Sequence, residues 1–175
     1  MKLNAKQLRK FLPKGKDLKK VKKNPIYFVL DNVLDTYNIG SLFRLADAVG
    51  ATKMYLCGDT EYPPSSRIHK AAVGTENWVS WTRAKNALRA VGELKRSGVQ
   101  IIAVEQSPRS IHYSLITSHL RLPAAIVVGH ETKGVSKEVL KASDIIVELP
   151  MHGINRSFNV WGSAAVIAYK ILERI

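Results

Sequence analysis

The sequence contains a single cysteine, Cys57, among 175 residues. One thiol cannot form a disulfide within the chain, and Cys57 lies in an apolar stretch typical of a strand, so we interpret it as a reduced packing residue. A zinc site built from cysteines is excluded as well, and the spacing of the five histidines matches no metal-binding motif. We therefore expect no metal.

Long apolar runs are also missing. No run approaches the roughly 18 to 20 residues that a membrane span needs, and the N-terminal segment is too polar for a secretory signal. A hydrophobic content of 46% and a charged content of 23% are ordinary for a soluble globular domain. We expect one domain in a cytoplasmic protein, with no membrane partner.

Several catalytic and phosphate-binding motifs are absent. No G-x-G-x-x-G follows the first predicted strand, and the chain has no P-loop and no G-x-S-x-G elbow. These absences argue against dinucleotide-binding, NTPase and α/β-hydrolase functions.

Positive charge, by contrast, is abundant and unevenly spread. The chain has 27 Lys and Arg against 14 Asp and Glu, and residues 1–23 hold ten basic side chains and one acidic one. A dense basic arm suits the phosphate backbone of a nucleic acid, although a solvated, disordered tail has the same composition. We divide the chain into a basic N-terminal arm expected to bind nucleic acid, residues 1–23, and a domain over residues 24–175.

Within that domain, short apolar runs alternate with helical patterns. Strands are predicted at residues 26–30, 52–57, 78–81, 99–104, 124–129 and 144–149, and helices at 39–49, 84–97, 137–141 and 158–174. The strands lack clean polar alternation, which is typical of sheets buried on both faces. The pattern predicts an α/β domain, a mostly parallel sheet with helices on both faces.

Ligands of open parallel sheets bind beyond the carboxyl ends of the strands, and unusual residues follow the first predicted strand. Asn38 is expected to cap the next helix. Gly40 lacks a Cβ, so the guanidinium of Arg44, four residues later, is expected to lie over the first turn near Asn38 and grip a phosphate or ribose. A capped helix with a surface arginine would give the same pattern.

Two later segments also place unusual residues directly after a predicted strand. Gly129 directly follows a buried strand, which permits close approach by a ligand, and Glu131 offers an acceptor at the sheet edge. The segment 149–159 is long enough to wrap a purine, with Ser157 as the expected cap of the last helix and Asn159 one turn inside it. A routine glycine-bounded loop and an ordinary cap are the alternatives.

Taken together, these three segments resemble the motifs of the SpoU (TrmH-like) branch of the SPOUT RNA methyltransferases, over about residues 25–175. The chain departs from the pattern at His130 and at Trp161-Gly162. The matches are Asn38, Gly40 and Arg44 to N-x-G-x-x-x-R; Gly129, Glu131 and Gly134 to G-x-E-x-x-G; and Pro150, Met151, Gly153, Ser157, Phe158, Asn159 and Val160 to P-M-x-G-x-x-x-S-[LF]-N-V.

The resemblance implies a C-terminal trefoil knot, which sequence patterns alone would not suggest. It also implies a homodimer with the active site at the subunit interface, S-adenosyl-L-methionine as cofactor, and methyl transfer to a ribose 2′-hydroxyl of tRNA or rRNA. By position, the implied cofactor contacts are Gly129, Leu149 and Phe158, with Glu105 in the loop after Val104.

For the acceptor side, we expect Arg44 to anchor the substrate phosphate and the 2′-oxygen, because a guanidinium pKa above about 12 makes it a poor base. Asn38 is expected to hold Arg44. Glu131, Ser157 and Asn159 are expected to shape the site. Two other functions fit the sequence: an RNA-binding protein that keeps the fold without catalysis, and a flavodoxin-like nucleotide-binding module.

Overall fold

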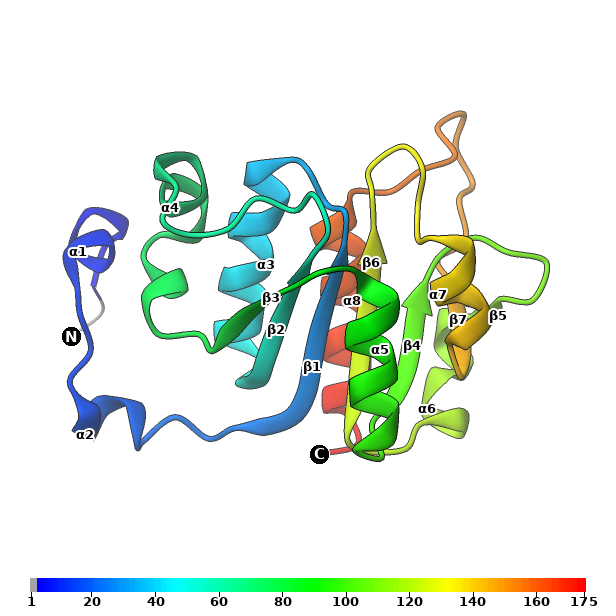
Figure 1. The fold of residues 1–175 in the computed structure, drawn as a ribbon, viewed down its shortest axis with the longest axis horizontal. Coiled ribbons are helices and arrows are strands. Elements are labelled where there is room, and N and C mark those ends of the chain that lie inside the picture. The colour runs from blue at the N-terminus through cyan, green and yellow to red at the C-terminus, as the bar shows by residue number, and fades with distance from the viewer. Residues whose placement is uncertain (1–2) are drawn as a thin grey trace.

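A computed structural model describes residues 3–175 and contains one seven-stranded sheet. All six strand ladders are parallel, and the strand order is β3-β2-β1-β6-β4-β7-β5 (Figure 1). The predicted parallel α/β sheet is confirmed. The strands are β1 (Asn24–Asp31), β2 (Ala51–Cys57), β3 (Trp81–Ala84), β4 (Gln100–Val104), β5 (Ile111–His112), β6 (Ala124–Gly129) and β7 (Ile145–Glu148).

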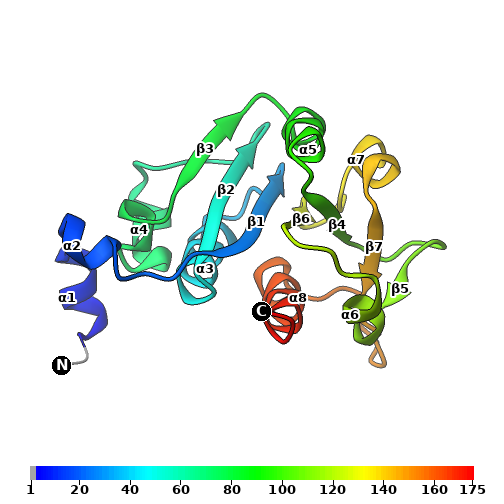
Figure 2. The same ribbon diagram turned by 90° about the horizontal axis from the view of Figure 1, so that it is seen from below.

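Helices cover both faces of this sheet, as Figure 2 shows. On one face lie α3 (Thr36–Ala48), α4 (Ser66–Ala72), α6 (Ile116–His119) and α8 (Val160–Leu172), and on the other α5 (Ala87–Arg96) and α7 (Lys137–Ala142). Short 3-10 helices, η1 (Thr75–Asn77) and η2 (Tyr113–Leu115), complete the connections. Each face of the sheet therefore has its own apolar core.

The central strand β6 explains why the apolar runs show no polar alternation. All six of its residues are buried. Ala124, Ile126 and Val128 belong to the larger core beneath α3 and α8, whereas Ala125 and Val127 belong to the smaller core beneath α5 and α7. Both faces of the strand are covered, so both sets of side chains must be apolar.

The basic arm contains two short helices, α1 (Ala5–Lys10) and α2 (Gly15–Leu18). The Arg9 guanidinium donates to the carbonyl of Lys70 at 3.1 Å, and the Phe11 ring meets the Trp78 ring edge-on at 6.2 Å. Gly74, with a φ of +94°, lies so close to the arm that a Cβ there would be 2.7 Å from the carbonyl oxygen of Leu8. Residues 1 and 2 of the arm lie outside the described residues.

Several element predictions need correction. The strand expected at 78–81 is wrong, because Trp78 is the C-cap of η1 and β3 begins only at Trp81. Helix α4 was not predicted, since it follows directly on a turn-rich stretch. No helix among residues 3–175 is long and apolar enough to cross a membrane. The trefoil knot stays a prediction.

Candidate active site

A cleft of about 260 Å³ lies beyond the carboxyl ends of β4, β6 and β7. Its walls come from the loops that follow these strands and from the start of α8. The cleft is lined by residues 104–106, 128–134, 147–149, 151, 156–158, 160 and 163. The structure thus brings Glu105, Gly129, Glu131, Leu149, Ser157 and Phe158 into one site. Their individual roles stay predictions.

The loop after β6 closes on itself. The amide of His130 donates to the carbonyl of Gly134 at 3.1 Å, and the amide of Gly134 donates back at 2.8 Å. His130 Nδ1 accepts from the amide of Thr132 at 3.1 Å, which fixes the turn. A Cβ on Gly129 would collide with the backbone of Gly134 and Val135. A ligand was expected to approach Gly129 closely, but the backbone of the loop after β6 occupies that space.

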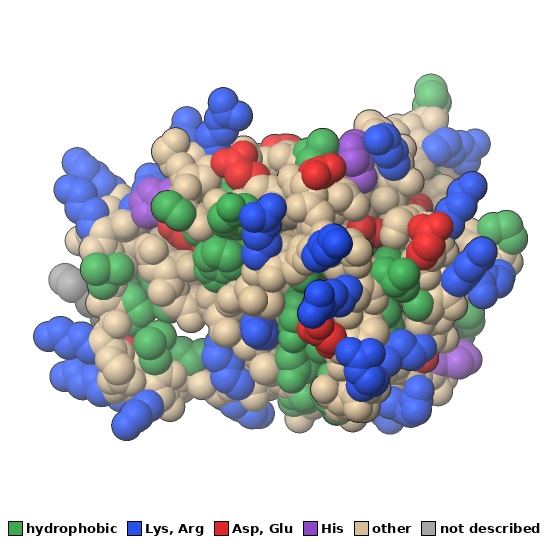
Figure 3. Space-filling view, viewed as in Figure 1, with side chains coloured by type: hydrophobic (Ala, Val, Ile, Leu, Met, Phe, Trp, Pro, Cys, Tyr) green, Lys and Arg blue, Asp and Glu red, His purple; other side chains and the backbone are tan. Residues whose placement is uncertain are grey.

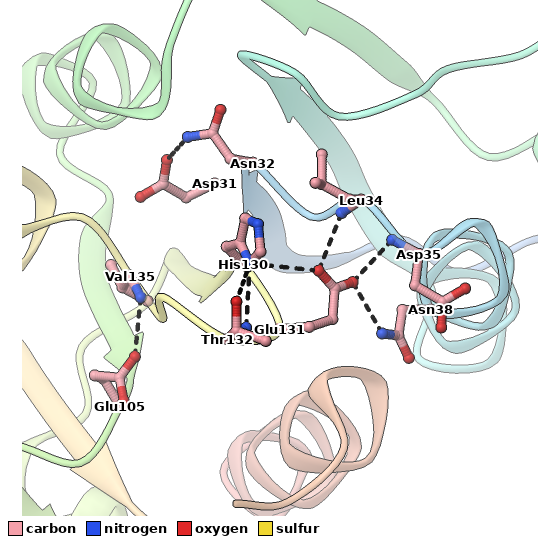
Figure 4. A network of polar contacts seen from close by, with 10 residues as sticks. All are labelled: Asp31, Asn32, Leu34, Asp35, Asn38, Glu105, His130, Glu131, Thr132 and Val135. Carbon is pink, nitrogen blue, oxygen red and sulfur yellow. Dashed lines mark hydrogen bonds and ion pairs between the residues drawn. The ribbon is translucent and has the colours of Figure 1, made fainter.

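The carboxylate of Glu131 fastens this loop to the loop after β1 (Figure 4). It accepts hydrogen bonds from the amides of Leu34 (3.2 Å) and Asp35 (2.9 Å) and from Asn38 Nδ2 (3.0 Å). Burial by itself would raise the pKa of Glu131, but these hydrogen bonds outweigh it and hold the pKa below its ordinary value. Glu131 is therefore an anion at neutral pH that holds two loops together.

Two further carboxylates tie loop ends together. Glu105, the expected cofactor contact, accepts from the amides of Val135 and Gln106, each at 2.9 Å. Asp31, at the end of β1 and only 3% exposed, accepts from the amide of Ser136 at 2.8 Å and from Asn32 Nδ2 at 2.9 Å. Sequence reasoning missed Asp31. The signal was an acidic residue ending an otherwise apolar strand.

The third loop differs from its prediction at the start of α8. Asn159 is the N-cap, and its Oδ1 accepts from the amides of Trp161 (3.0 Å) and Gly162 (3.4 Å). The prediction that Ser157 caps this helix is wrong, since its hydroxyl donates to Asn155 Oδ1 instead. The unusual Gly162 makes room for the Phe158 ring, which would lie 2.9 Å from a Cβ there.

The first motif also needs correction. Asp35 caps α3, with its Oδ1 accepting from the amide of Tyr37 at 2.8 Å, so the prediction of Asn38 as N-cap is wrong. Asn38 lies in the first turn, and its Nδ2 donates to Glu131. It does not hold Arg44 as expected, which would require its Oδ1 to accept from the guanidinium. Its Oδ1 is buried and accepts no hydrogen bond within residues 3–175.

Gly40 and Arg44 do not act together as predicted. Gly40 is buried against α4, where a Cβ would lie 2.5 Å from the Cβ of Ala71. Arg44 is exposed, about 9 Å further along the axis of α3 than Asn38, and does not line the cleft. The expected anchor is therefore not part of the cleft wall in this protomer.

The chain is similar in sequence to a known protein family. Residues 25–169 match the model of the SpoU rRNA Methylase family. The chain is 29% identical to a tRNA (guanosine(18)-2′-O)-methyltransferase of Borreliella burgdorferi, with 87% of this chain and 68% of that protein covered. It is 31% identical to the 23S rRNA (guanosine-2′-O-)-methyltransferase RlmB of Neisseria meningitidis, with 86% and 59% covered.

Solved structures show the same likeness. The TrmH/SpoU tRNA modifying enzyme of A. aeolicus superposes with a TM-score of 0.78 at 26% identity, covering 97% of this chain and 81% of that one. An AdoMet-bound rRNA methyltransferase from Sinorhizobium meliloti shares the fold, with a TM-score of 0.79 at 24% identity and coverages of 96% and 60%. The family model, the relatives and the loop geometry agree: the chain belongs to the SpoU rRNA methylase family.

Proposed function

We propose that this protein is an RNA methyltransferase that moves a methyl group from S-adenosyl-L-methionine to a ribose 2′-hydroxyl of tRNA or rRNA. The observation that carries the proposal is that the loops after β4, β6 and β7 together form one cleft in a SpoU-family chain. The named relatives that modify tRNA and 23S rRNA support the substrate class.

The cleft suits this cofactor chemically. Leu149, Met151 and Phe158 supply apolar contacts, and the main chain of the surrounding loops supplies polar edges, which together fit a purine nucleoside. Glu105 and Glu131 add negative charge where a sulfonium cation would be attracted. When bound, the cofactor supplies an electrophilic methyl group. The AdoMet-bound structure with the same fold supports the assignment.

The residues of this chain would act mainly by positioning. Transfer requires the 2′-oxygen in line with the methyl carbon and water excluded, and a fixed geometry lowers the barrier more than any single proton acceptor. Glu131 holds the loops after β1 and β6 together, and Asn159 fixes the start of α8. Arg44 would grip the substrate phosphate and the 2′-oxygen as a permanent cation.

Because Arg44 lies outside the cleft of its own protomer, we propose a homodimer in which it serves the cleft of the partner. The surface beside the cleft supports a subunit contact. Ile154 is fully exposed and Phe158 is 54% exposed, and large apolar side chains gathered beside a ligand cleft are typical of interfaces. The symmetric arrangement would give two composite sites.

Calorimetry with S-adenosyl-L-methionine and methylation of RNA from a strain that lacks the protein test the activity. We expect binding, and methyl transfer that nucleoside mapping assigns to a ribose. Failure to bind the cofactor rejects the proposal. Binding without transfer to tRNA or rRNA would instead support the inactive, RNA-binding alternative.

The composite site is tested by mixing two inactive variants. Arg44→Ala removes the anchor, and Gly129→Val disrupts the cleft loop. If Arg44 acts on the partner's cleft, each mixed dimer keeps one intact site, and an equal mixture should regain about a quarter of wild-type activity. If Arg44 acts on its own cleft, mixing restores nothing. Matched circular dichroism spectra exclude misfolding as the cause.

We also propose that the arm contributes to RNA binding and that the protein works in the cytoplasm, where tRNA and rRNA are met. Changing Lys16, Lys19, Lys20, Lys22 and Lys23 to Gln should weaken RNA binding and flatten its salt dependence, because fewer counterions are released. Cofactor affinity should not change. An unaltered salt slope would remove the arm from the RNA surface. These lysines avoid the docking residues Arg9 and Phe11.

A further inference from the structure

A second hollow, of about 630 Å³, lies beside α4 and β3. It belongs to the opposite end of the sheet from β7 and the loop at 150–158, as Figure 1 shows for these elements. Its walls are Pro63, Pro64, Ser65, Ser66, His69, Glu76, Asn77 and Trp81. None of these residues belongs to the three motif loops, so the methyl-transfer site leaves the hollow unexplained.

The polar wall of the hollow contains an unusual pair. His69 Nδ1 lies 2.5 Å from Glu76 Oε1, and the Glu76 side chain is only 6% exposed. The other oxygen, Oε2, is buried without a hydrogen-bond partner within residues 3–175. A buried acceptor left unpaired costs free energy, which favours a purpose beyond packing.

The pair fixes which nitrogen of His69 a ligand can meet. With Nδ1 turned to the carboxylate, Nε2 is left without a hydrogen bond in the described part of the chain, and the side chain is 39% exposed. Nε2 accepts a hydrogen bond when the ring is neutral and donates one when it is protonated. Asn77, exposed beside it, adds an amide with both donors and an acceptor. Such groups match the edge of a nucleobase.

Trp81 in the wall and the side chains next to it offer flat surfaces. Trp81 is half-buried and meets the ring of Tyr62 at 6.3 Å, with 36° between the planes. The Arg83 guanidinium lies over the Tyr62 ring, 4.7 Å from its centre. Unpaired bases stack on aromatic rings and on guanidinium planes, and RNA is read mostly in this splayed, single-stranded form.

Positive charge surrounds this end of the molecule. Helix α4 carries Arg67 and Lys70, and the arm docks on α4 through Arg9. In Figure 3, Lys and Arg side chains project from the end of the molecule where α1 and α2 lie. Phosphates on either side of a bound base would therefore meet cations.

We propose that this hollow binds one unpaired nucleobase of the RNA, stacked near Trp81 and held at its edge by His69 and Asn77. The inference rests on the proposed function for the class of ligand. It adds a reading site separate from the cleft where the methyl group is transferred.

The three tryptophans provide the test. In the ¹⁵N-labelled protein, each indole N–H gives its own NMR signal. Trp81 reports on the hollow, Trp78 donates to Asp47 beside the arm, and Trp161 lies in the first turn of α8. A single-stranded RNA hexanucleotide should shift the Trp81 signal most. The matching ribose-phosphate oligomer without bases should leave it in place.

Two variants and a control sharpen the result. Asn77→Ala and His69→Gln should each weaken hexanucleotide binding about five- to tenfold, the loss expected for one hydrogen bond. His119→Gln, an exposed histidine on α6, should have no effect. An equal Trp81 shift with the base-free oligomer, or RNA binding that leaves Trp81 unmoved, would overturn the proposal.

Methylation measured on the same samples separates this proposal from the proposed function. An unmoved Trp81 signal with intact methyl transfer overturns only the reading site. A shifted Trp81 signal with no methyl transfer overturns only the enzyme assignment. If the hexanucleotide does not bind at all, the proposed base site is rejected regardless of cofactor binding.

Discussion

Replacing Glu131 by Gln preserves the shape of the side chain but removes the charge that fastens two loops of the cleft. The carboxylate accepts three hydrogen bonds, from Leu34 N, Asp35 N and Asn38 Nδ2. In Glu131→Gln one oxygen still accepts, whereas the new NH₂ group faces an N–H donor. The loop after β1 is then held less firmly against the loop after β6.

The expected cost follows from the bonds lost. A hydrogen bond to a charged group contributes about 1.5 to 3 kcal/mol. Losing one such bond, and placing the new NH₂ group against an N–H that also donates, should destabilise the fold by about 2 to 3 kcal/mol. For a domain of this size each kcal/mol lowers Tm by about 2 to 4 °C, which gives a fall of about 4 to 12 °C. S-adenosyl-L-methionine binding should weaken as well.

The pH dependence gives a second, independent check. The pKa of Glu131 is lowered in the folded protein, so its stabilisation is fully present above the unfolded pKa of about 4.3 and is lost as pH falls through the folded value. The stability gap between wild type and Glu131→Gln should be complete at pH 7 and should narrow below about pH 4.

Urea denaturation followed by circular dichroism measures both effects. Glu138→Gln is the matched control, because Glu138 is exposed in the first turn of α7 and should change stability by less than about 0.5 kcal/mol. A Glu131→Gln protein as stable as the control at pH 7, or equally destabilised at all pH values, would refute the reasoning.

Three further predictions concern the fold around the site. Asn159→Ala removes the cap of α8 and should cost about 1 kcal/mol in urea denaturation, whereas Ser157→Ala, which removes no cap, should cost less. Gly40→Ala forces a methyl group against Ala71 and the backbone of α4, and should lower the free energy of unfolding by about 1 to 3 kcal/mol; a neutral result would contradict the close packing of the two helices. Burial raises the pKa of the Cys57 thiol to about 12, so it should resist a thiol reagent at pH 8 until urea unfolds the protein, and rapid labelling of the folded protein would contradict its burial.

Much of the fold followed from patterns along the chain. The apolar runs at 124–129 and 99–104 and the helical spacing after Phe158 predicted elements that the structure contains. The rule that ligands bind beyond strand ends pointed to the loop with Glu131, and the family resemblance added Glu105 and Leu149; the structure places all three in one cleft. The strands and helices were predictable because the local periodicity of apolar residues can be read directly from the sequence.

Other features depend on partners distant in sequence. Asp35 and Asn38 are both good capping residues, and the choice between them is fixed by Glu131, almost a hundred residues later. Gly40 faces α4, a helix that the sequence did not predict because a turn-rich stretch precedes it. No local rule predicts that β6 lies between β1 and β4.

The late arrival of β6 has a consequence for a chain that is still being made. Strands β1 and β4 are complete by residue 104, yet the strand that joins them starts only at residue 124. A nascent chain that stops before this point exposes unpaired edges on both strands and two apolar faces, which are the features that drive aggregation. Fragments that end before residue 124 should therefore aggregate, and productive folding must wait for the last third of the protein.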